Sequence, residues 1–177
     1  IHLEKYNKGL LKETVIKNIN ELFNANNIIC AADPKRKNFF AYKNITLFKP
    51  NLKEVKESLL ILSEEVNEKI LADIHQQLKE KLHHNISLIT LSDKGMFYQS
   101  DADARIIPSH LRNIADVSGA GDTVIAVAAL IYAATKNIHL TAEIANIAGG
   151  LVCEVVGTAA IDKQKLLVEC KQLLTDL

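Results

Sequence analysis

The sequence is poor in the residues that nucleic-acid-binding proteins use. Its 177 residues contain no tryptophan and only 5% aromatic residues, so stacking platforms for single-stranded bases are not expected. Lysine and arginine together number 21, and aspartate and glutamate also number 21, which gives a formal net charge of zero. Phosphate-rich partners are gathered by a basic excess, and this chain has none. We therefore expect no nucleic-acid partner.

Cysteines and long apolar runs are also scarce. Cys30, Cys153 and Cys170 are odd in number and widely spaced, which fits neither a disulfide framework nor a paired metal-binding motif, so we expect a cytoplasmic protein. The longest uninterrupted apolar run, residues 124–134, is well short of the roughly 18 to 20 residues of a membrane-spanning helix. We expect no signal peptide and no membrane partner. Because the first residue is Ile1 rather than Met, we expect a fragment of a longer polypeptide.

Hydrophobic periodicity predicts strands that alternate with helices. We expect strands over residues 28–32, 45–48, 86–91, 96–98 and 105–107, and helices over 9–26, after 51, and over 63–84, 121–134, 141–156 and 162–174. This order is typical of an α/β fold with a largely parallel sheet, here covered by three closing helices. No repeat or linker interrupts the chain, so residues 1–177 are expected to form one domain. The first helix should bury the stripe of Leu10, Leu11, Val15, Ile19, Leu22 and Phe23.

Glycine is scarce as well, and its placement is therefore informative. Five of the seven glycines lie in the last third, two of them in the segment 116–123, which reads Asp-Val-Ser-Gly-Ala-Gly-Asp-Thr and precedes a strongly helical stretch. Small residues at a helix N-terminus leave backbone N–H groups free, and the positive end of the helix dipole attracts anions. The segment predicts an anion site. Asp122 is then either a base that accepts a proton from an attacking hydroxyl or a residue that caps the helix.

Residues 116–122 resemble the second signature of the ribokinase-like, phosphofructokinase-B type sugar kinases, whose pattern is D-T/V-T/S-G-A-G-D. The resemblance implies a three-layer αβα ribokinase-like fold with a mostly parallel sheet. It also implies that the amides of Gly119, Ala120 and Gly121 form an anion hole for the migrating phosphoryl group. Asp122 would be the catalytic base on the sugar hydroxyl.

Further elements of the same family occur in the expected order. Asn51-Leu52-Lys53-Glu54 resembles the N-x-x-E element, in which Glu54 would hold the magnesium of MgATP through water, with a first-turn helix glutamate as the alternative. Thr90 to Gly95 resembles a segment that lies against the nucleotide, and residues 145–150 resemble the helix beside the adenine. Taken singly, Thr90 is better interpreted as an ordinary strand residue and Asn146 as a helix-surface amide. The nucleotide-binding residues implied by the resemblance are Lys35, Asn51, Glu54, Thr90, Gly95, Asn146 and Gly150.

Within the family the chain is similar to the heptose 7-phosphate kinases. The likeness lies in residues 3–11, in residues 116–124, and in Asp33-Pro34-Lys35 followed by Phe39 and Tyr42. Lys35 would meet the ATP phosphates at a strand end, or else be a solvated lysine in the basic turn 35–37. Lys49 departs from the pattern, because the subfamily usually has threonine there.

The resemblance implies an ATP-dependent kinase that uses Mg²⁺, with a nucleotide and a sugar phosphate as its small-molecule partners. The substrate expected from it is heptose 7-phosphate, for ADP-heptose and lipopolysaccharide core synthesis. A monovalent cation and a homodimer are left open. The chain corresponds to the second half of the kinase domain, so the fragment alone is expected to be inactive. The alternatives are another ribokinase-like kinase, a non-catalytic nucleotide-binding module, and a partner-binding domain that uses the helix over residues 63–84.

Overall fold

The computed structural model describes residues 2–3, 13–110 and 112–174, and it is built on one six-stranded sheet with its strands in chain order. The first four strands are parallel to one another, and the last two extend the sheet as antiparallel hairpins, so the expected mostly parallel sheet is confirmed. The strands are β1 (His2–Leu3), β2 (Ala31–Ala32), β3 (Leu47–Phe48), β4 (Ile86–Thr90), β5 (Met96–Gln99) and β6 (Ala104–Ile107).

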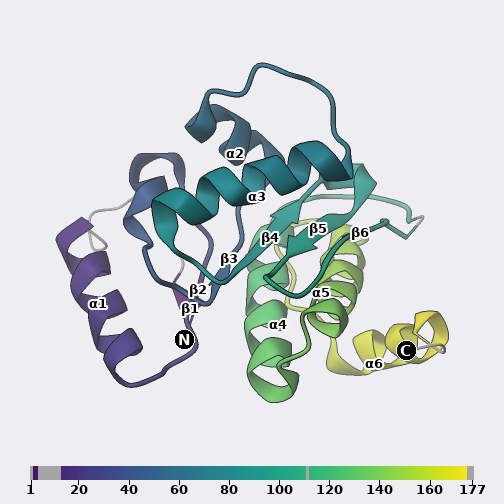
Figure 1. Ribbon diagram of the computed structural model, residues 1–177. Coiled ribbons are helices and arrows are strands. Elements are labelled where there is room, and N and C mark those ends of the chain that lie inside the picture. Colours follow the sequence, from purple (N-terminus) through teal and green to yellow (C-terminus); the bar gives the residue numbers. More distant parts are fainter. Residues whose placement is uncertain (1, 4–12, 111, 175–177) are drawn as a thin grey trace.

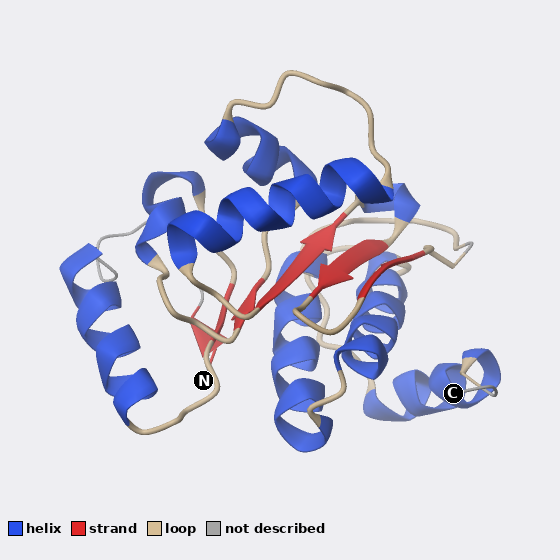
Figure 2. Ribbon diagram, in the orientation of Figure 1, coloured by secondary structure: helices blue, strands red, loops and turns tan. Residues whose placement is uncertain are grey.

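Helices cover both faces of this sheet (Figures 1 and 2). On one face lie α1 (Glu13–Ala25), the 3-10 helix η1 (Arg36–Ala41), α2 (Leu52–Leu59) and α3 (Glu68–Leu82). On the other lie α4 (Ala120–Thr135) and α5 (Ile138–Cys153), with α6 (Lys163–Leu173) packed against α5. A short 3-10 helix, η2 (Ser92–Lys94), joins β4 to β5. The result is the three-layer αβα arrangement expected from the sequence.

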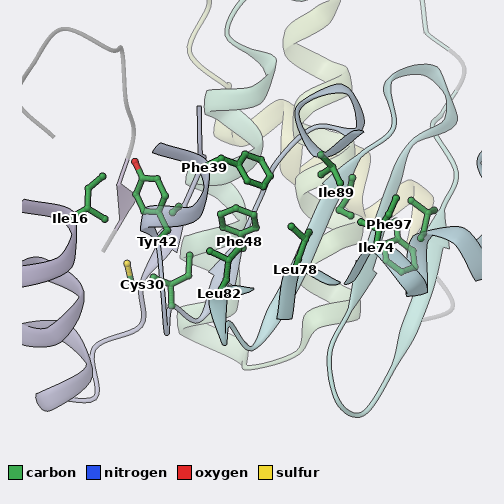
Figure 3. Packing of buried hydrophobic residues seen from close by; sticks show 14 of the residues in the cluster. Ile16, Cys30, Phe39, Tyr42, Phe48, Ile74, Leu78, Leu82, Ile89 and Phe97 are labelled. Atoms are coloured by element: carbon green, nitrogen blue, oxygen red, sulfur yellow. The ribbon is translucent and has the colours of Figure 1, made fainter. Parts of the chain in front are cut away.

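Two hydrophobic clusters fill the space between the layers. Successive strand residues point to opposite faces, so Phe48 belongs to the cluster under α1, α2 and α3, whereas Leu47 belongs to the cluster under α4 and α5. The first cluster contains Phe39, whose ring meets that of Phe48 edge to face at 5.2 Å between centroids. Figure 3 shows these two rings with Leu78 and Leu82 of α3 beside them. Burial on both faces explains why the parallel strands read as short apolar runs.

The second cluster depends on small side chains. Helices α4 and α5 are rich in alanine and lie close together. A Cβ atom placed on Gly149 would come within 2.6 Å of Val124 Cγ2, so glycine is required for this approach. The close contact fixes α4, and with it the segment 116–122 at its start.

Three expectations about the helices need correction. In α1 the buried residues are Ile16, Asn20 and Phe23, whereas Val15 and Leu22 are 38% and 59% exposed, because the buried stripe runs one residue later than expected. Leu10 and Leu11 lie outside the described residues. Helix α3 begins at Glu68 rather than near residue 63, because the Asn67 side chain caps it by accepting the Ile70 N–H at 3.0 Å.

The third correction concerns the closing helices, of which two rather than three cover the sheet. None of the residues of α6 is fully buried, and the helix lies on α5. Across residues 2–3, 13–110 and 112–174, no helix has the length and apolar character needed to cross a membrane.

Candidate active site

The start of α4 has backbone N–H groups that face no protein acceptor. Gly119 is the N-cap residue and adopts a left-handed conformation with φ of 79°, and a Cβ atom there would lie 3.0 Å from Thr158 Cγ2. Ala120 N–H donates to the Val117 carbonyl at 3.3 Å. The N–H groups of Gly119 and Gly121 donate to no group within the described part of the chain. Together with the helix dipole, they form a site suited to an anion.

A carboxylate holds this turn in place. Asp116 Oδ1 accepts the Ser118 N–H at 2.9 Å and the Ser118 hydroxyl at 2.8 Å, and Asp116 Oδ2 accepts the Gly157 N–H at 3.0 Å. These hydrogen bonds, the one from the Ser118 backbone foremost, hold the pKa of Asp116 below its usual value. Asp116 thereby ties the start of α4 to the loop after α5. Its signal in the sequence is an aspartate two residues before a serine, the pattern of an Asx turn.

Asp122 is the third residue of α4 and is partly buried. The N-cap is Gly119, so Asp122 is not the capping residue itself. Its carboxylate lies in the first turn, where the positive end of the helix stabilises a negative charge. The arrangement therefore brings a carboxylate within one helical turn of the N–H groups of Gly119 and Gly121.

Strands β2 and β3 end in a cluster of charged residues. Asp33, which is 1% exposed, follows β2, and Lys49, with its side chain 3% exposed, follows β3. Lys49 Nζ lies 3.2 Å from Asp33 Oδ1, and Lys35 Nζ lies 3.0 Å from Asp33 Oδ2. Lys35 Nζ also lies 3.4 Å from Glu54 Oε1. Sequence reasoning gave Asp33 no role of its own and noted Lys49 only as a departure from a pattern.

Lys35 is therefore not an isolated solvated lysine, because its ammonium bridges two carboxylates. Burial alone would lower the pKa of Lys35, but the charges and hydrogen bonds of Asp33 and Glu54 outweigh that effect and raise the pKa above its usual value. Lys35 remains fully charged near neutral pH. A cation at a strand end of an open α/β sheet lies where such folds bind their ligands.

Asn51 and Glu54 begin α2 with a reciprocal cap. Asn51 Oδ1 accepts the Glu54 N–H at 2.8 Å, and Glu54 Oε2 accepts the Asn51 N–H at 2.9 Å. Asn51 also forms a parallel bridge with Thr90, whose N–H donates to the Pro50 carbonyl at 3.2 Å. The N-x-x-E element and the end of β4 are thus adjacent.

The remaining predicted site residues, Gly95, Asn146 and Gly150, have structural contacts with the segment after β6. Gly95 has φ of 95°, and a Cβ atom there would lie 2.0 Å from the Ile107 carbonyl oxygen. Asn146 Nδ2 donates to the Pro108 carbonyl at 2.9 Å. A Cβ atom on Gly150 would lie 2.7 Å from Arg112 Nε. These three residues lie against the end of β6, Pro108 and Arg112, and none is part of the charged cluster at the strand ends.

The charged cluster borders a shallow hollow of about 680 Å³ lined by Lys35, Arg36, Lys37 and Glu54. No group of three or more histidine, cysteine, aspartate or glutamate side chains gathers as a metal cage within the described ranges. Mg²⁺ rarely needs such a cage, because it keeps several waters and binds one or two carboxylates together with substrate phosphates. The partly exposed Glu54 carboxylate beside an open, cationic hollow fits that mode of binding.

Comparison with known proteins identifies a family that this chain matches. The family model described as pfkB family carbohydrate kinase matches residues 1–165. Among curated relatives, the bifunctional protein HldE of Aliarcobacter butzleri is 37% identical over 159 residues, covering 90% of this chain and 33% of the relative. HldE of Helicobacter pylori strain J99 is 31% identical over 171 residues, covering 96% of this chain and 36% of the relative. The chain thus spans about a third of the length of these relatives.

Solved structures share the fold at low sequence identity. Phosphofructokinase-2 from Escherichia coli in complex with potassium superposes with a TM-score of 0.81 at 17% identity, over 93% of this chain and 53% of that protein. Arabidopsis thaliana ribokinase complexed with ribose and ATP gives a TM-score of 0.78 at 16% identity, over 94% of this chain and 54% of that protein. The ribokinase-like fold is thereby confirmed.

Proposed function

Because the chain belongs to the pfkB family of carbohydrate kinases, we propose that residues 1–177 form the nucleotide-binding half of an ATP-dependent sugar kinase. The proposed reaction transfers the γ-phosphoryl group of MgATP to a sugar hydroxyl. The acceptor we propose is heptose 7-phosphate, which would yield heptose 1,7-bisphosphate for ADP-heptose and lipopolysaccharide core synthesis.

The observation that carries this proposal is the start of α4. The N–H groups of Gly119 and Gly121, which have no acceptor among the described residues, and Asp122 all belong to the first turn of this helix and its cap. Phosphoryl transfer requires donors for the charge on the phosphoryl oxygens and an acceptor for the proton of the attacking hydroxyl.

In the proposed phosphoryl transfer each of these residues has a separate role. The N–H groups of Gly119 and Gly121 donate to the oxygens of the migrating phosphoryl group. Asp122 accepts the proton that leaves the sugar hydroxyl as its oxygen bonds to phosphorus, and the bond between that phosphorus and the ADP oxygen breaks. Asp116 keeps the turn in the geometry that this requires, through its hydrogen bonds to Ser118 and Gly157.

Glu54 is the residue that would hold Mg²⁺, through the water shell of the ion. The metal, when bound with ATP, neutralises charge on the phosphates. Glu54 Oε2 serves the cap of α2, and Oε1 is shared with Lys35, so the same side chain would fix both the helix and the ion.

The heptose substrate is supported by the relatives and by the Asp33-Pro34-Lys35 segment, which resembles the heptose 7-phosphate kinases. The acceptor-binding residues of the family precede the region to which this chain corresponds. We therefore propose that the chain binds nucleotide but does not turn over alone.

Titration calorimetry of the chain with ATP, in the presence and absence of Mg²⁺, tests this proposal. We expect Mg²⁺-dependent binding that weakens in the Glu54→Gln variant. Glu57→Gln is the matched control, because Glu57 lies one turn further along α2 and, in the described part of the chain, has the exposed Arg36 as its one recorded charge partner, at 4.0 Å. A folded chain that binds neither ATP nor MgATP would contradict the proposed function.

A further inference from the structure

The segment that joins α2 to α3 carries two leucines that face outward. Leu60 is 84% exposed and Leu62 is 94% exposed, the two highest values among the large hydrophobic residues of the described chain. Ile61 between them is half-buried and packs against the first hydrophobic cluster. Figure 1 shows this segment as an open arch between the two helices. Because Ile61 anchors the arch inward, the leucines on either side of it remain in solvent.

Leu60 is also an unusual residue for its backbone conformation. It ends α2 in the left-handed region, with φ of 56° and ψ of 38°, and the Ile61 N–H donates to the Lys56 carbonyl at 2.9 Å. Glycine or asparagine is preferred at such a helix end, because a Cβ atom is strained there. Among the non-glycine residues with positive φ in the described ranges, Leu60 is the apolar one, and the others are asparagine, histidine, serine and lysine. A leucine that is both strained and largely exposed contributes little to this fold, which points to a contact with another molecule.

Charges of both signs surround the two leucines. A hollow of about 760 Å³ separates them from α2, and its charged lining residues are Arg36, Lys53, Lys56, Glu57 and Glu64. The side chains of Arg36 and Glu64 are 84% and 99% exposed, and their recorded charge partners within the described chain lie at 4.0 and 3.9 Å. Both side chains can therefore also pair with an opposite charge on a second molecule. A nucleic acid or an anionic membrane favours a surface of positive sign, whereas this rim carries both signs.

A rim with both signs is complementary to a second copy of itself. In two copies related by a two-fold axis every contact occurs twice, so Arg36 of either copy can face Glu64 of the other. We propose that residues 60–64 and the adjoining face of α2 form a self-association surface, on which a second copy of this chain docks. Leu60 and Leu62 of the two copies pack against each other at its centre, and the charged residues form its edge.

The composition of this surface fits a weak, reversible dimer. Burying one leucine side chain changes an association constant by about 10- to 100-fold. Each copy supplies two such side chains, and exposed ion pairs at the edge of an interface add little affinity. We therefore expect a dissociation constant on the order of 10 μM.

Analytical ultracentrifugation of the chain without nucleotide, from about 1 to about 300 μM, tests the inference. We expect a dimer in the wild type, and a dissociation constant at least about tenfold higher in Leu60→Gly and in Leu62→Ser. Leu130→Ser is one matched control, because Leu130 is a 68% exposed leucine on α4. Lys136→Gly is the other, because Lys136 ends α4 with the same φ of 56°. Both control variants should dimerise as the wild type does.

Leu60→Gly separates loss of the interface from loss of the fold. Glycine suits the left-handed conformation better than leucine does, and little packing is lost from a side chain that is 84% exposed. At concentrations where both proteins are monomers, the urea midpoint of this variant should therefore equal or exceed that of the wild type. Weaker association of a variant that is at least as stable supports the inference.

A charge exchange tests the two-fold arrangement. Arg36→Glu and Glu64→Lys should each weaken self-association, because each places like charges opposite one another. An equimolar mixture of the two variants should associate more tightly than either alone, since both pairs of the mixed dimer are again of opposite sign. A mixture that associates no more tightly than the single variants overturns the two-fold arrangement.

Two other results overturn the inference as a whole. One is a wild-type chain that stays monomeric over the full concentration range, which would leave the leucines to a different partner. The other is a dimer that persists in Leu60→Gly and Leu62→Ser, and a dimer lost in Leu130→Ser alone would place the contact on α4 instead. No nucleotide enters these measurements, so their outcome is independent of the proposed function.

Discussion

Glu54 and Asn51 exchange hydrogen bonds across the first turn of α2, each side chain accepting the backbone N–H of the other. The same Glu54 carboxylate contacts Lys35 through its second oxygen. A residue that caps a helix and is also proposed to hold Mg²⁺ needs a substitution that separates the two roles.

Glu54→Gln makes that separation. The amide oxygen of glutamine can still accept the Asn51 N–H, so we expect the free energy of unfolding to change by less than about 1 kcal/mol. The loss of charge should raise the Mg²⁺ concentration needed for half-maximal ATP binding. Urea unfolding and calorimetry at several Mg²⁺ concentrations measure the two effects. An unshifted Mg²⁺ titration would leave Glu54 with the cap as its one role.

Asp122→Asn tests the proposed base. In a polypeptide that also carries the acceptor-binding half, we expect turnover to fall by roughly 10² to 10⁴, because asparagine cannot accept the proton. The affinity of MgATP, measured by calorimetry on this chain, should stay within about threefold of the wild-type value. Asp73→Asn, in α3 and outside the charged cluster, serves as the control. Equal turnover in Asp122→Asn and wild type would remove Asp122 from the reaction.

The sequence predicts elements best where the pattern is local. The apolar run from Ile86 forms β4, which ends at Thr90, one residue earlier than expected. Within residues 28–32 the strand itself is Ala31–Ala32, because its register with β3 begins at Leu47 and the Cys30 N–H donates to the Thr46 hydroxyl at 3.2 Å. Strand ends depend on partners far away in the sequence, and a local pattern does not contain them.

The same distinction applies to the candidate site. The segment around Gly119 stands out in the sequence because glycine is rare and its backbone role is local. The pairing of Asp33 with Lys49 depends on the register of β2 and β3, in which Ala32 lies opposite Phe48 and the next residues therefore adjoin. No local sequence pattern predicts that register, so the buried ion pair of Asp33 and Lys49 can be identified only from the structure.

Two buried histidines beside the first hydrophobic cluster share the hydroxyl of Ser87. Ser87 Oγ lies 2.9 Å from His75 Nδ1 and 2.7 Å from His84 Nε2. Burial, with smaller contributions from His75 and Lys79, lowers the pKa of His84 to about 3, and burial likewise lowers the pKa of His75. From sequence alone, the adjacent pair His83 and His84 suggests a protonated helix cap. His84 is instead buried and neutral, and it is His83 that ends α3.

The lowered pKa values of His75 and His84 predict that the free energy of unfolding decreases in acid. Both histidines titrate near pH 6.5 in the unfolded chain, so their contribution to stability is fully present above that pH. It is lost as the pH falls toward the lowered pKa values of the folded state, which for His84 is about 3. Each histidine whose pKa is lowered by folding adds up to about 1.4 kcal/mol per pH unit to the slope of the unfolding free energy against pH. Urea unfolding between pH 7.5 and about pH 4.5 measures it. We expect a smaller slope in His84→Gln and an unchanged slope in His83→Asn, whereas parallel curves for all three proteins would contradict the assignment.

We expect Gly95→Ala to lower the free energy of unfolding more than Gly157→Ala does, although each substitution adds one methyl group. The φ of 95° at Gly95 is strained for any side chain, and a Cβ atom would overlap the Ile107 carbonyl oxygen at 2.0 Å, where backbone cannot yield easily. Gly157 offers a matched control, because it has φ of 80° but no atom within 4 Å of the position that a Cβ would take. Strain alone costs about 1 to 2 kcal/mol, so Gly157→Ala should lose about that much in urea unfolding. Gly95→Ala should lose clearly more, because the clash forces the start of β5 and the end of β6 apart. Equal losses in the two variants would mean that residues 107–109 shift to make room for the methyl group, and that glycine is needed at position 95 for its backbone conformation alone.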